Sequence, residues 1–222
     1  MITSKNRNKI AAVIPFFNEK NTVHRIIQAT LKHVDAVIAI DDGSTDDSAV
    51  NISLLKNITL LKNNTNRGKG FSLRKGLNYA VENGFDELVT LDADLQHNPD
   101  EIPLLVSKLN EYHIVIGNRL NNLKGMPLQR KISNNITSKL LSIKTGQKIL
   151  DSQCGFRAYR SEVIRNVKTN TDGYEAESEI VIKASLLGYQ IGFTDITTIY
   201  GDEISKMTPV KSTIGFIKLL FN

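Results

Sequence analysis

The sequence predicts an α/β fold in which a mostly parallel central sheet is flanked by helices. Short apolar runs, typical of buried strands, alternate with segments whose apolar residues recur every three or four positions, as on one helix face. Two of the apolar runs end in turns rich in aspartate, and ligands bind at the carboxyl ends of strands in open α/β sheets. With 222 residues, 41% hydrophobic and 23% charged, the chain fits one domain with a sizeable core.

These patterns place the elements in chain order. The apolar runs predict strands over residues 10–15, 36–40, 58–61, 87–91 and 114–116. The helical spacing predicts helices over residues 19–33, after Gly70, over residues 99–109 and around Glu179. The apolar faces of three of these helices are expected in the core: Val23, Ile26, Ile27 and Leu31; Leu73, Leu77, Ala80 and Val81; Ile180, Val181, Ala184 and Leu187.

Residues 120–150 carry basic side chains among apolar ones, and no acidic residue interrupts them before Asp151. An amphipathic helix over residues 126–143 would lie on a membrane surface or pack on its own core, and the pattern alone favours neither. The C-terminal end repeats the theme, with a strongly apolar run over residues 214–221. We therefore expect a main domain of residues 1–207 and an amphipathic helical segment of residues 208–222.

The composition limits the compartment and the partners. A formal charge of +5 favours an anionic partner, such as nucleotide phosphates, nucleic acid or an anionic membrane surface. The single cysteine, Cys154, excludes an internal disulfide framework and fits a buried small hydrophobe. No apolar stretch approaches the roughly 20 residues that cross a bilayer, and the N-terminus lacks a secretory pattern. We expect a cytoplasmic protein that contacts membranes only at their cytoplasmic face, as a peripheral protein.

The most informative turn follows the apolar run that ends at Leu91. Asp92, Asp94 and Gln96 offer two carboxylates and an amide, and these oxygen ligands suit a hard cation such as Mg²⁺ or Mn²⁺. The alternative is a turn of short polar residues that caps a helix near Pro99. A second acidic turn, around Asp42, ends another apolar run and strengthens the metal hypothesis.

Seven short motifs then occur in an order known from one family. They are VIPFFNE (13–19), DDGSTD (41–46), NRGKG (66–70), DADLQ (92–96), GNR (117–119), DSQCGFR (151–157) and YGDEISK (200–206). In these motifs the chain resembles the GT-A glycosyltransferases of family 2, most closely the dolichol-phosphate mannose synthase and polyprenyl-phosphate glycosyltransferase branch. The resemblance implies the GT-A fold. It also implies transfer of a hexose, with inversion, from a nucleoside diphosphate sugar to a polyprenyl phosphate.

The resemblance assigns a donor site residue by residue. It implies that the nucleotide sugar is held by Pro15, Phe17, Glu19, Ile40, Asp42, Lys69, Asp92, Ala93 and Asp94. It implies that Asp92 and Asp94, with Gln96, carry the metal on the diphosphate. Phe17 stands where the family commonly has Tyr, so stacking on a base survives and a phenolic hydrogen bond is lost. The loop of residues 68–70, which opens a helix, is expected to lend backbone N–H groups to phosphate.

The resemblance also implies an acceptor site. Arg119, Arg130 and Lys206 would position the acceptor phosphate, which is anionic at neutral pH and needs no strong base. The expected catalytic residues are Asp92, Asp94, Arg119 and Asp151. The alternative within the family is a soluble enzyme that acts on a sugar hydroxyl, with Asp151 as the base. Thr198 replaces an Arg of the eukaryotic mannose synthases, so the donor sugar stays open.

Three alternative functions come from other classes of protein. A nucleotidyltransferase joins a similar sheet to Mg²⁺ and a nucleotide, but it opens with a glycine-rich loop that residues 15–19 lack. A non-catalytic nucleotide-sugar binding module would carry the same residues. A nucleic-acid partner is not expected, because the chain has no Trp and only 6% aromatic residues for base stacking. The sequence does not determine the oligomeric state.

Overall fold

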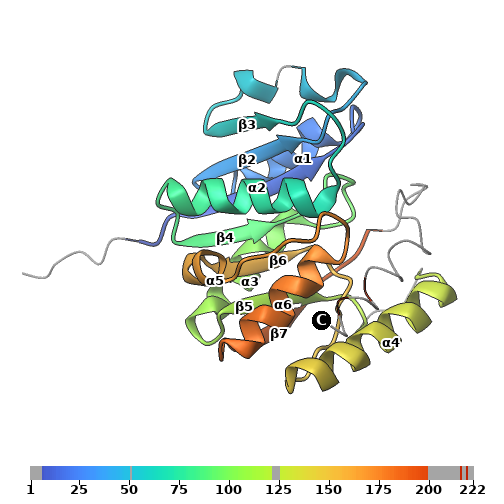
Figure 1. Ribbon diagram of the computed structural model, residues 1–222. Helices are drawn as coiled ribbons and strands as arrows, with labels where there is room; N and C mark the ends of the chain where they lie inside the picture. Colours follow the sequence, from blue (N-terminus) through green and yellow to red (C-terminus); the bar gives the residue numbers. More distant parts are fainter. Residues whose placement is uncertain (1–6, 51, 122–125, 200–215, 217–218, 220–222) are drawn as a thin grey trace, which may run out of the picture.

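The computed structural model describes residues 7–50, 52–121 and 126–199, together with Phe216 and Leu219. Its centre is a seven-stranded sheet in the order β3-β2-β1-β4-β6-β5-β7 (Figure 1). The strands are β1 Ile10–Phe16, β2 Ala36–Asp41, β3 Ile58–Lys62, β4 Glu87–Thr90, β5 Ile114–Asn118, β6 Arg157–Arg160 and β7 Ile191–Asp195. Strand pairs are parallel except the two that β6 makes, which confirms the mostly parallel sheet.

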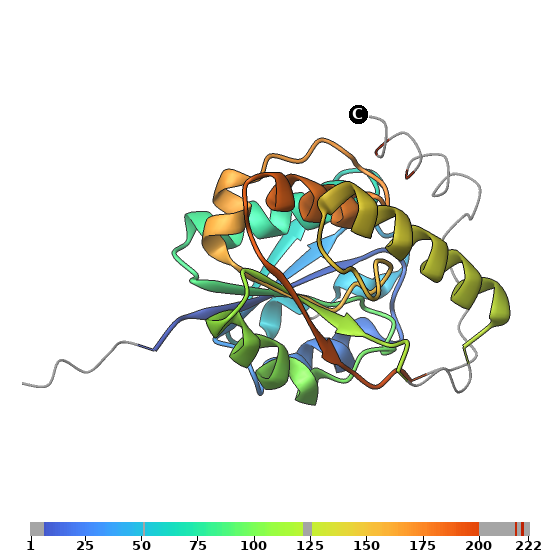
Figure 2. The ribbon, with the colours of Figure 1, turned by 90° about the horizontal axis from the view of Figure 1, so that it is seen from below.

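Helices cover both faces of this sheet (Figure 2). One face carries α2 (Lys69–Glu82), α5 (Ser161–Asn166) and α6 (Ala176–Leu186), and the other carries α1 (Val23–Thr30) and α3 (Ile102–Ser107). The long helix α4 (Leu128–Thr145) packs beside α6, near the β7 end of the sheet. Short 3₁₀ turns occur at Asp47–Ala49, Ile52–Leu54, Pro99–Glu101 and Lys108–Asn110. No helix in the described part of the chain is long and apolar enough to span a membrane.

The sequence prediction missed two strands, β6 and β7, and the helix α5. β6 has the sequence RAYR, and its Arg157 is buried, so no apolar run marks this strand. The helix expected over residues 99–109 is broken into 3₁₀ turns around the short α3. Pro103 lies in the first turn of α3, and its missing N–H prevents the helix from continuing backwards.

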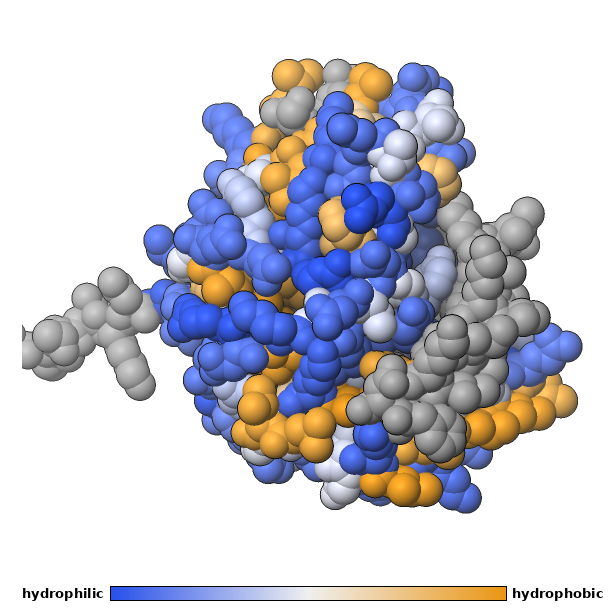
Figure 3. All heavy atoms as spheres, in the orientation of Figure 1, coloured by the Kyte–Doolittle hydropathy of each residue, from blue (hydrophilic) through white to orange (hydrophobic). Residues whose placement is uncertain are grey.

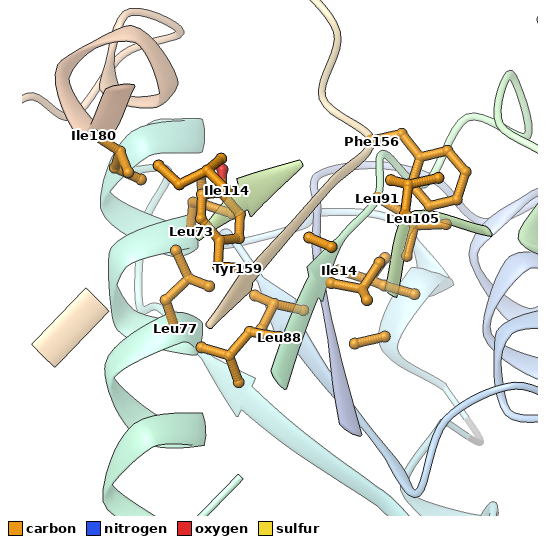
Figure 4. Close-up of a cluster of buried hydrophobic side chains, with 14 of the residues drawn as sticks. Ile14, Leu73, Leu77, Leu88, Leu91, Leu105, Ile114, Phe156, Tyr159 and Ile180 are labelled. Carbon is orange, nitrogen blue, oxygen red and sulfur yellow. The ribbon is translucent and has the colours of Figure 1, made fainter. Parts of the chain in front are cut away.

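The hydrophobic core lies between the sheet and its two helix layers. Leu73 and Leu77 of α2 face Leu88 and Tyr159 of the sheet (Figure 4), which confirms the core face predicted for this helix. Leu187 was predicted in the core, but it is 57% exposed, because α6 ends at Leu186.

Phe216 belongs to the same core and is only 8% exposed, and Leu219 packs against that core. These two residues belong to the segment of residues 208–222 that the sequence predicts to be amphipathic. The other residues of the segment, and Lys206 before it, lie outside the described residues.

Candidate active site

The ends of β1, β2 and β4 meet at one edge of the sheet. Pro15 of β1 is the register partner of Ile40 of β2. β1 also pairs with β4, and Asp92 follows two residues after the end of that strand. The loops after β1 and β2 are joined, since the Glu19 N–H donates to Ser48 Oγ over 2.7 Å. Residues that the sequence assigned to one donor site are therefore brought together, with Phe17 and Glu19 half-buried.

Asp42 is buried, and its carboxylate organises the loop before α2. It accepts hydrogen bonds from Asn63 Nδ2 at 2.8 Å and from Ser72 Oγ at 2.9 Å. It also accepts from the backbone N–H groups of Arg67 at 3.0 Å and Gly68 at 2.9 Å. These bonds give Asp42 a structural role in addition to the donor-site role that the resemblance implies.

The start of α2 differs from the prediction that its N–H groups face phosphate. The N–H of Gly70 donates to the Asp172 carbonyl over 2.8 Å, and the N–H of Phe71 donates to the same oxygen over 3.3 Å. Gly68 has a φ of +97°, and a Cβ there would lie 2.4 Å from that carbonyl oxygen, so glycine is required. The prediction is wrong for these N–H groups, because another loop of the protein caps them.

Lys69 instead places its ammonium group between two carboxylates. Its Nζ lies 2.6 Å from Asp92 Oδ1 and 3.1 Å from Glu177 Oε2, and His97 Nε2 lies 3.6 Å from Asp92 Oδ2. Burial alone would lower the pKa of Lys69, but the two carboxylates raise it above its ordinary value. Burial alone would raise the pKa of Asp92, but Lys69 and His97 hold it well below its ordinary range. Lys69 therefore joins Asp92 and Glu177 through one ammonium group.

The turn after β4 offers oxygen ligands of the kind that a hard cation prefers. Asp92 has a side chain 31% exposed, and Asp94 Oδ1 accepts the Gln96 N–H over 3.1 Å across Leu95, whose φ is +62°. The described residues contain no cluster of three or more His, Cys, Asp or Glu placed to hold a metal. Two carboxylates fit Mg²⁺ or Mn²⁺ if water and a substrate phosphate complete the coordination.

Gly155 packs directly against this turn. A Cβ at this position would lie 2.6 Å from Asp92 Oδ2 and 3.0 Å from Lys69 Nζ. The backbone is held there because Thr90 Oγ1 donates to the Gly155 carbonyl over 2.9 Å. The glycine of the DSQCGFR motif thus leaves room for the Asp92 carboxylate.

We expect Gly155→Ala to weaken Mn²⁺ binding about 10- to 100-fold, as substitutions behind a metal ligand do. The added methyl group displaces two flexible side-chain ends rather than backbone, so the fold is expected to survive. Titration with Mn²⁺ measures the first effect and thermal unfolding measures the second. Unchanged Mn²⁺ affinity in a folded variant would contradict this explanation of the glycine.

Arg119 and Asp151 form a two-point ion pair beside this site. Arg119 Nε lies 2.8 Å from Asp151 Oδ2, and Arg119 Nη2 lies 2.9 Å from Oδ1. Asn134 Nδ2 of α4 donates to Oδ1 over 2.6 Å. Asp151 is fully buried; burial alone would raise its pKa, but Arg119 and Asn134 hold it below the ordinary value. This geometry argues against Asp151 as a base and makes it a positioning residue for Arg119.

Arg130 lies on the same side of α4 as Asn134, one turn earlier. It has no ion pair among the described residues. Lys206, the third cation expected there, lies outside them. Cys154 is buried, and burial raises the pKa of its thiol to about 12, which confirms a buried hydrophobe rather than a nucleophile.

Comparison with known proteins gives the family. Residues 11–168 match the family described as Glycosyl transferase family 2. The chain is 30% identical to the UDP-N-acetylglucosamine–dolichyl-phosphate N-acetylglucosaminyltransferase of Methanococcus voltae, over 93% of this chain and 92% of that protein. It is 33% identical to the undecaprenyl-phosphate 4-deoxy-4-formamido-L-arabinose transferase of Proteus mirabilis, over 74% of this chain and 52% of that protein.

A solved structure matches the fold over most of its length. Glucosyl-3-phosphoglycerate synthase from Mycobacterium tuberculosis, in complex with Mn²⁺, UDP-glucose and phosphoglyceric acid, superimposes with a TM-score of 0.72 at 20% identity. The match covers 96% of this chain and 77% of that one. The sheet, its helices and these matches confirm the GT-A fold, and the chain belongs to glycosyl transferase family 2.

Proposed function

We propose that this protein transfers a hexose from a nucleoside diphosphate sugar to a polyprenyl phosphate, with inversion at the anomeric carbon. Two relatives support the acceptor class, since their names specify dolichyl phosphate and undecaprenyl phosphate. The Mycobacterium complex, which holds Mn²⁺ and UDP-glucose, supports the donor class and the metal. The donor sugar and its nucleotide are left open.

The observation that carries the proposal is the burial of Asp151. A sugar hydroxyl needs a base to remove its proton, whereas a phosphomonoester is already an anion at neutral pH. Asp151 is fully buried, and both of its oxygens accept hydrogen bonds from Arg119. A carboxylate in this position cannot approach an acceptor hydroxyl, so an acceptor that arrives as an anion fits the site better.

The protein's own residues divide the remaining tasks. Asp92 and Asp94 present two carboxylates to the diphosphate side, and a divalent cation held there would neutralise the charge of the leaving group. Arg119 is fixed by Asp151, and Arg130 lies on α4 one turn before Asn134, which bonds Asp151. We assign these arginines to the acceptor phosphate, where charge-assisted hydrogen bonds orient the attacking oxygen.

Lys206 is assigned to the same phosphate by resemblance. The chain reaches the metal turn just before it, because the Ile199 N–H donates to the Gln96 carbonyl over 3.0 Å. Lys206 itself lies outside the described residues, so its assignment rests on the resemblance.

The test is a donor screen against acceptors of both classes. Labelled UDP- and GDP-sugars are incubated with a short polyprenyl phosphate, the matching polyprenol and simple sugars, and the products are identified. We expect a polyprenyl phosphosugar and no glycosylated alcohol. Products formed only on hydroxyl groups would contradict the proposal and support the alternative of a soluble enzyme that acts on a sugar hydroxyl. Donor binding without any turnover would identify a binding module.

We further propose that α4 holds the enzyme on an anionic membrane surface at the cytoplasmic face. Its exposed side bears five large apolar residues, with exposures from 39% to 78%: Leu128, Ile132, Ile136, Leu140 and Ile143. Its buried side has two polar residues, Asn134 and Ser138, and one apolar residue, Leu141. In Figure 3, apolar surface lies at the lower right, where Figure 1 places α4. A helix that packs on its own core would bury most of these apolar residues, whereas α4 exposes them.

The charges of α4 favour this partner over a neutral one. Arg130, Lys131, Lys139 and Lys144 lie along the helix, and it contains no acidic residue. Each basic residue near an anionic leaflet contributes about 1 kcal/mol. Since a prenyl chain stays in the bilayer, at ~0.8 kcal/mol per buried CH₂, the site has to come to the lipid headgroups. The core position of Phe216 makes α4 a better candidate for this contact than the C-terminal run.

We expect the double variant Ile132→Asn/Ile143→Asn to bind anionic vesicles at least about tenfold more weakly, because two apolar side chains lose their burial. The matched control is Leu54→Asn/Leu104→Asn, which removes two exposed apolar side chains from other surfaces. Co-sedimentation with vesicles of mixed anionic and zwitterionic lipid measures both. Equal losses in the two double variants would contradict the membrane role of α4.

A further inference from the structure

Lys69 forms an ion pair with Asp92, whose carboxylate the proposed function assigns to a metal. We propose that Lys69 is a displaceable counter-cation: it holds Asp92 until metal and donor bind, and then stays with Glu177 beside the diphosphate. This inference rests on the proposed function in taking Asp92 as a metal ligand. It adds a residue, Glu177, that neither the motifs nor the sequence pattern identified.

The distances show an ammonium group shared between two acceptors. Nζ of Lys69 lies 2.6 Å from Asp92 and 3.1 Å from Glu177. The ammonium group has three N–H donors, so it can break one contact and keep the other. The side chain of Lys69 is largely buried, so bulk water does not readily replace a lost carboxylate.

Glu177 has the capacity to receive the displaced cation. Its Oε1 is buried and has no hydrogen-bond partner among the described residues, although Arg157 Nε lies 3.9 Å away. The residue is held in place because Arg157 Nη1 donates to the Glu177 carbonyl over 2.9 Å. A buried carboxylate oxygen without a donor is costly, and a second N–H from Lys69 would satisfy it.

The charges account for both states. Without a metal, Lys69 separates Asp92 from Glu177, two carboxylates that would otherwise repel each other in a poorly hydrated site. With a metal, the divalent charge matches Asp92 and Asp94, and Lys69 matches Glu177. Lys69 then lies next to the additional negative charge of the diphosphate, which favours its new position.

A thermodynamic consequence follows for the order of binding. Metal alone has to break the contact between Lys69 and Asp92, so it binds weakly. Nucleoside diphosphate supplies new negative charge to Lys69, so metal and nucleotide strengthen each other's binding by the same factor. Lys69 keeps its proton throughout, and the exchange is one of partners only.

The experiment measures Mn²⁺ affinity by electron paramagnetic resonance, first without nucleotide and then with UDP or GDP. Lys69→Met is expected to bind Mn²⁺ about tenfold more tightly without nucleotide, because the competing cation is gone. With nucleotide the gain is expected to vanish or reverse. Lys75→Met is the matched control: it removes the same charge from the same helix, where Nζ bonds the Lys62 carbonyl and Asn63 Oδ1. Its Mn²⁺ affinity should not change.

Glu177→Gln provides a second variant with the opposite expected sign. Without the second carboxylate, displacement of Lys69 from Asp92 is harder, so Mn²⁺ alone should bind more weakly than to the wild type. Equal or weaker Mn²⁺ binding by a folded Lys69→Met variant would overturn the proposal. Asp92→Asn separates this failure from that of the proposed function: if it leaves wild-type Mn²⁺ binding intact, Asp92 is not a metal ligand and both proposals fall.

Discussion

Asp94→Asn is expected to lower the rate of sugar transfer by about two to three orders of magnitude, the usual cost of removing a preorganised group that stabilises transition-state charge. The substitution removes one negative charge from the metal turn and almost no volume. Asn Oδ1 can still accept the Gln96 N–H that Asp94 accepts now, so the turn is expected to keep its shape. The rate with polyprenyl phosphate at saturating donor measures the effect.

Asp100→Asn is the matched control for this variant. Asp100 lies a few residues further along, is highly exposed and pairs with His33 at 2.8 Å. The Asp100→Asn rate should stay within about twofold of the wild-type rate, because an exposed pair of this kind contributes little to stability. A rate for Asp94→Asn that equals the control, or full activity of the wild type in excess chelator, would exclude a metal-assisted mechanism.

The sequence predicted those parts of the fold that have a local sequence pattern, such as a continuous apolar run. β1 and β2 are continuous apolar runs, so their position and type were correct to within a residue. β6 could not be found in this way, because Arg157 is buried by donating to the Ser152 and Cys154 carbonyls of the preceding loop and to the Glu177 carbonyl of α6. Those acceptors are assembled only when the chain has folded, so a single sequence does not contain the signal.

The site residues divide in the same way, into those that a local pattern predicts and those that meet only in the folded chain. Pro15 and Ile40 lie near the ends of two strands and Asp92 follows a third, so strand periodicity and parallel topology are enough to bring them together. The contact of Lys69 with Asp92 and Glu177 joins α2, the β4 turn and α6. No local pattern predicts such a contact, because each residue alone resembles an ordinary surface charge.

For α4, the sequence left two interpretations, and the burial of its side chains supports the membrane contact that we propose. A helix that packs on its own core turns its apolar side inward. α4 instead buries Asn134 and Ser138, which bond Asp151 and Ser152. Of its large apolar residues it buries only Leu141 and exposes the other five. The buried polar side therefore belongs to the support of Arg119, and the apolar side is available to a partner.

Asp151→Ala is expected to destabilise the protein by about 3–5 kcal/mol, the usual cost of removing one partner from a buried ion pair. It leaves the guanidinium of Arg119 and the amide of Asn134 without their acceptor. Urea unfolding measures the change. Asp195→Asn is the control, because it changes an exposed carboxylate that accepts from Asn118 over 2.7 Å. Little destabilisation by Asp151→Ala would contradict the positioning role and restore the hydroxyl-acceptor alternative.

Asp151→Asn adds a dependence on pH that a catalytic base would not give. The pKa of Asp151 in the folded protein lies below its ordinary value of 3.8, so its ionised form stabilises the fold above that value. This stabilisation is lost as pH falls through the folded-state pKa. The Asn variant has no such ionisation, so the stability difference from the wild type should be full at neutral pH and shrink below about pH 4. A base would instead give a variant of unchanged stability whose transfer rate no longer rises with pH. A stability difference that stays constant from neutral to acid pH would show that the charge of Asp151 does not hold Arg119.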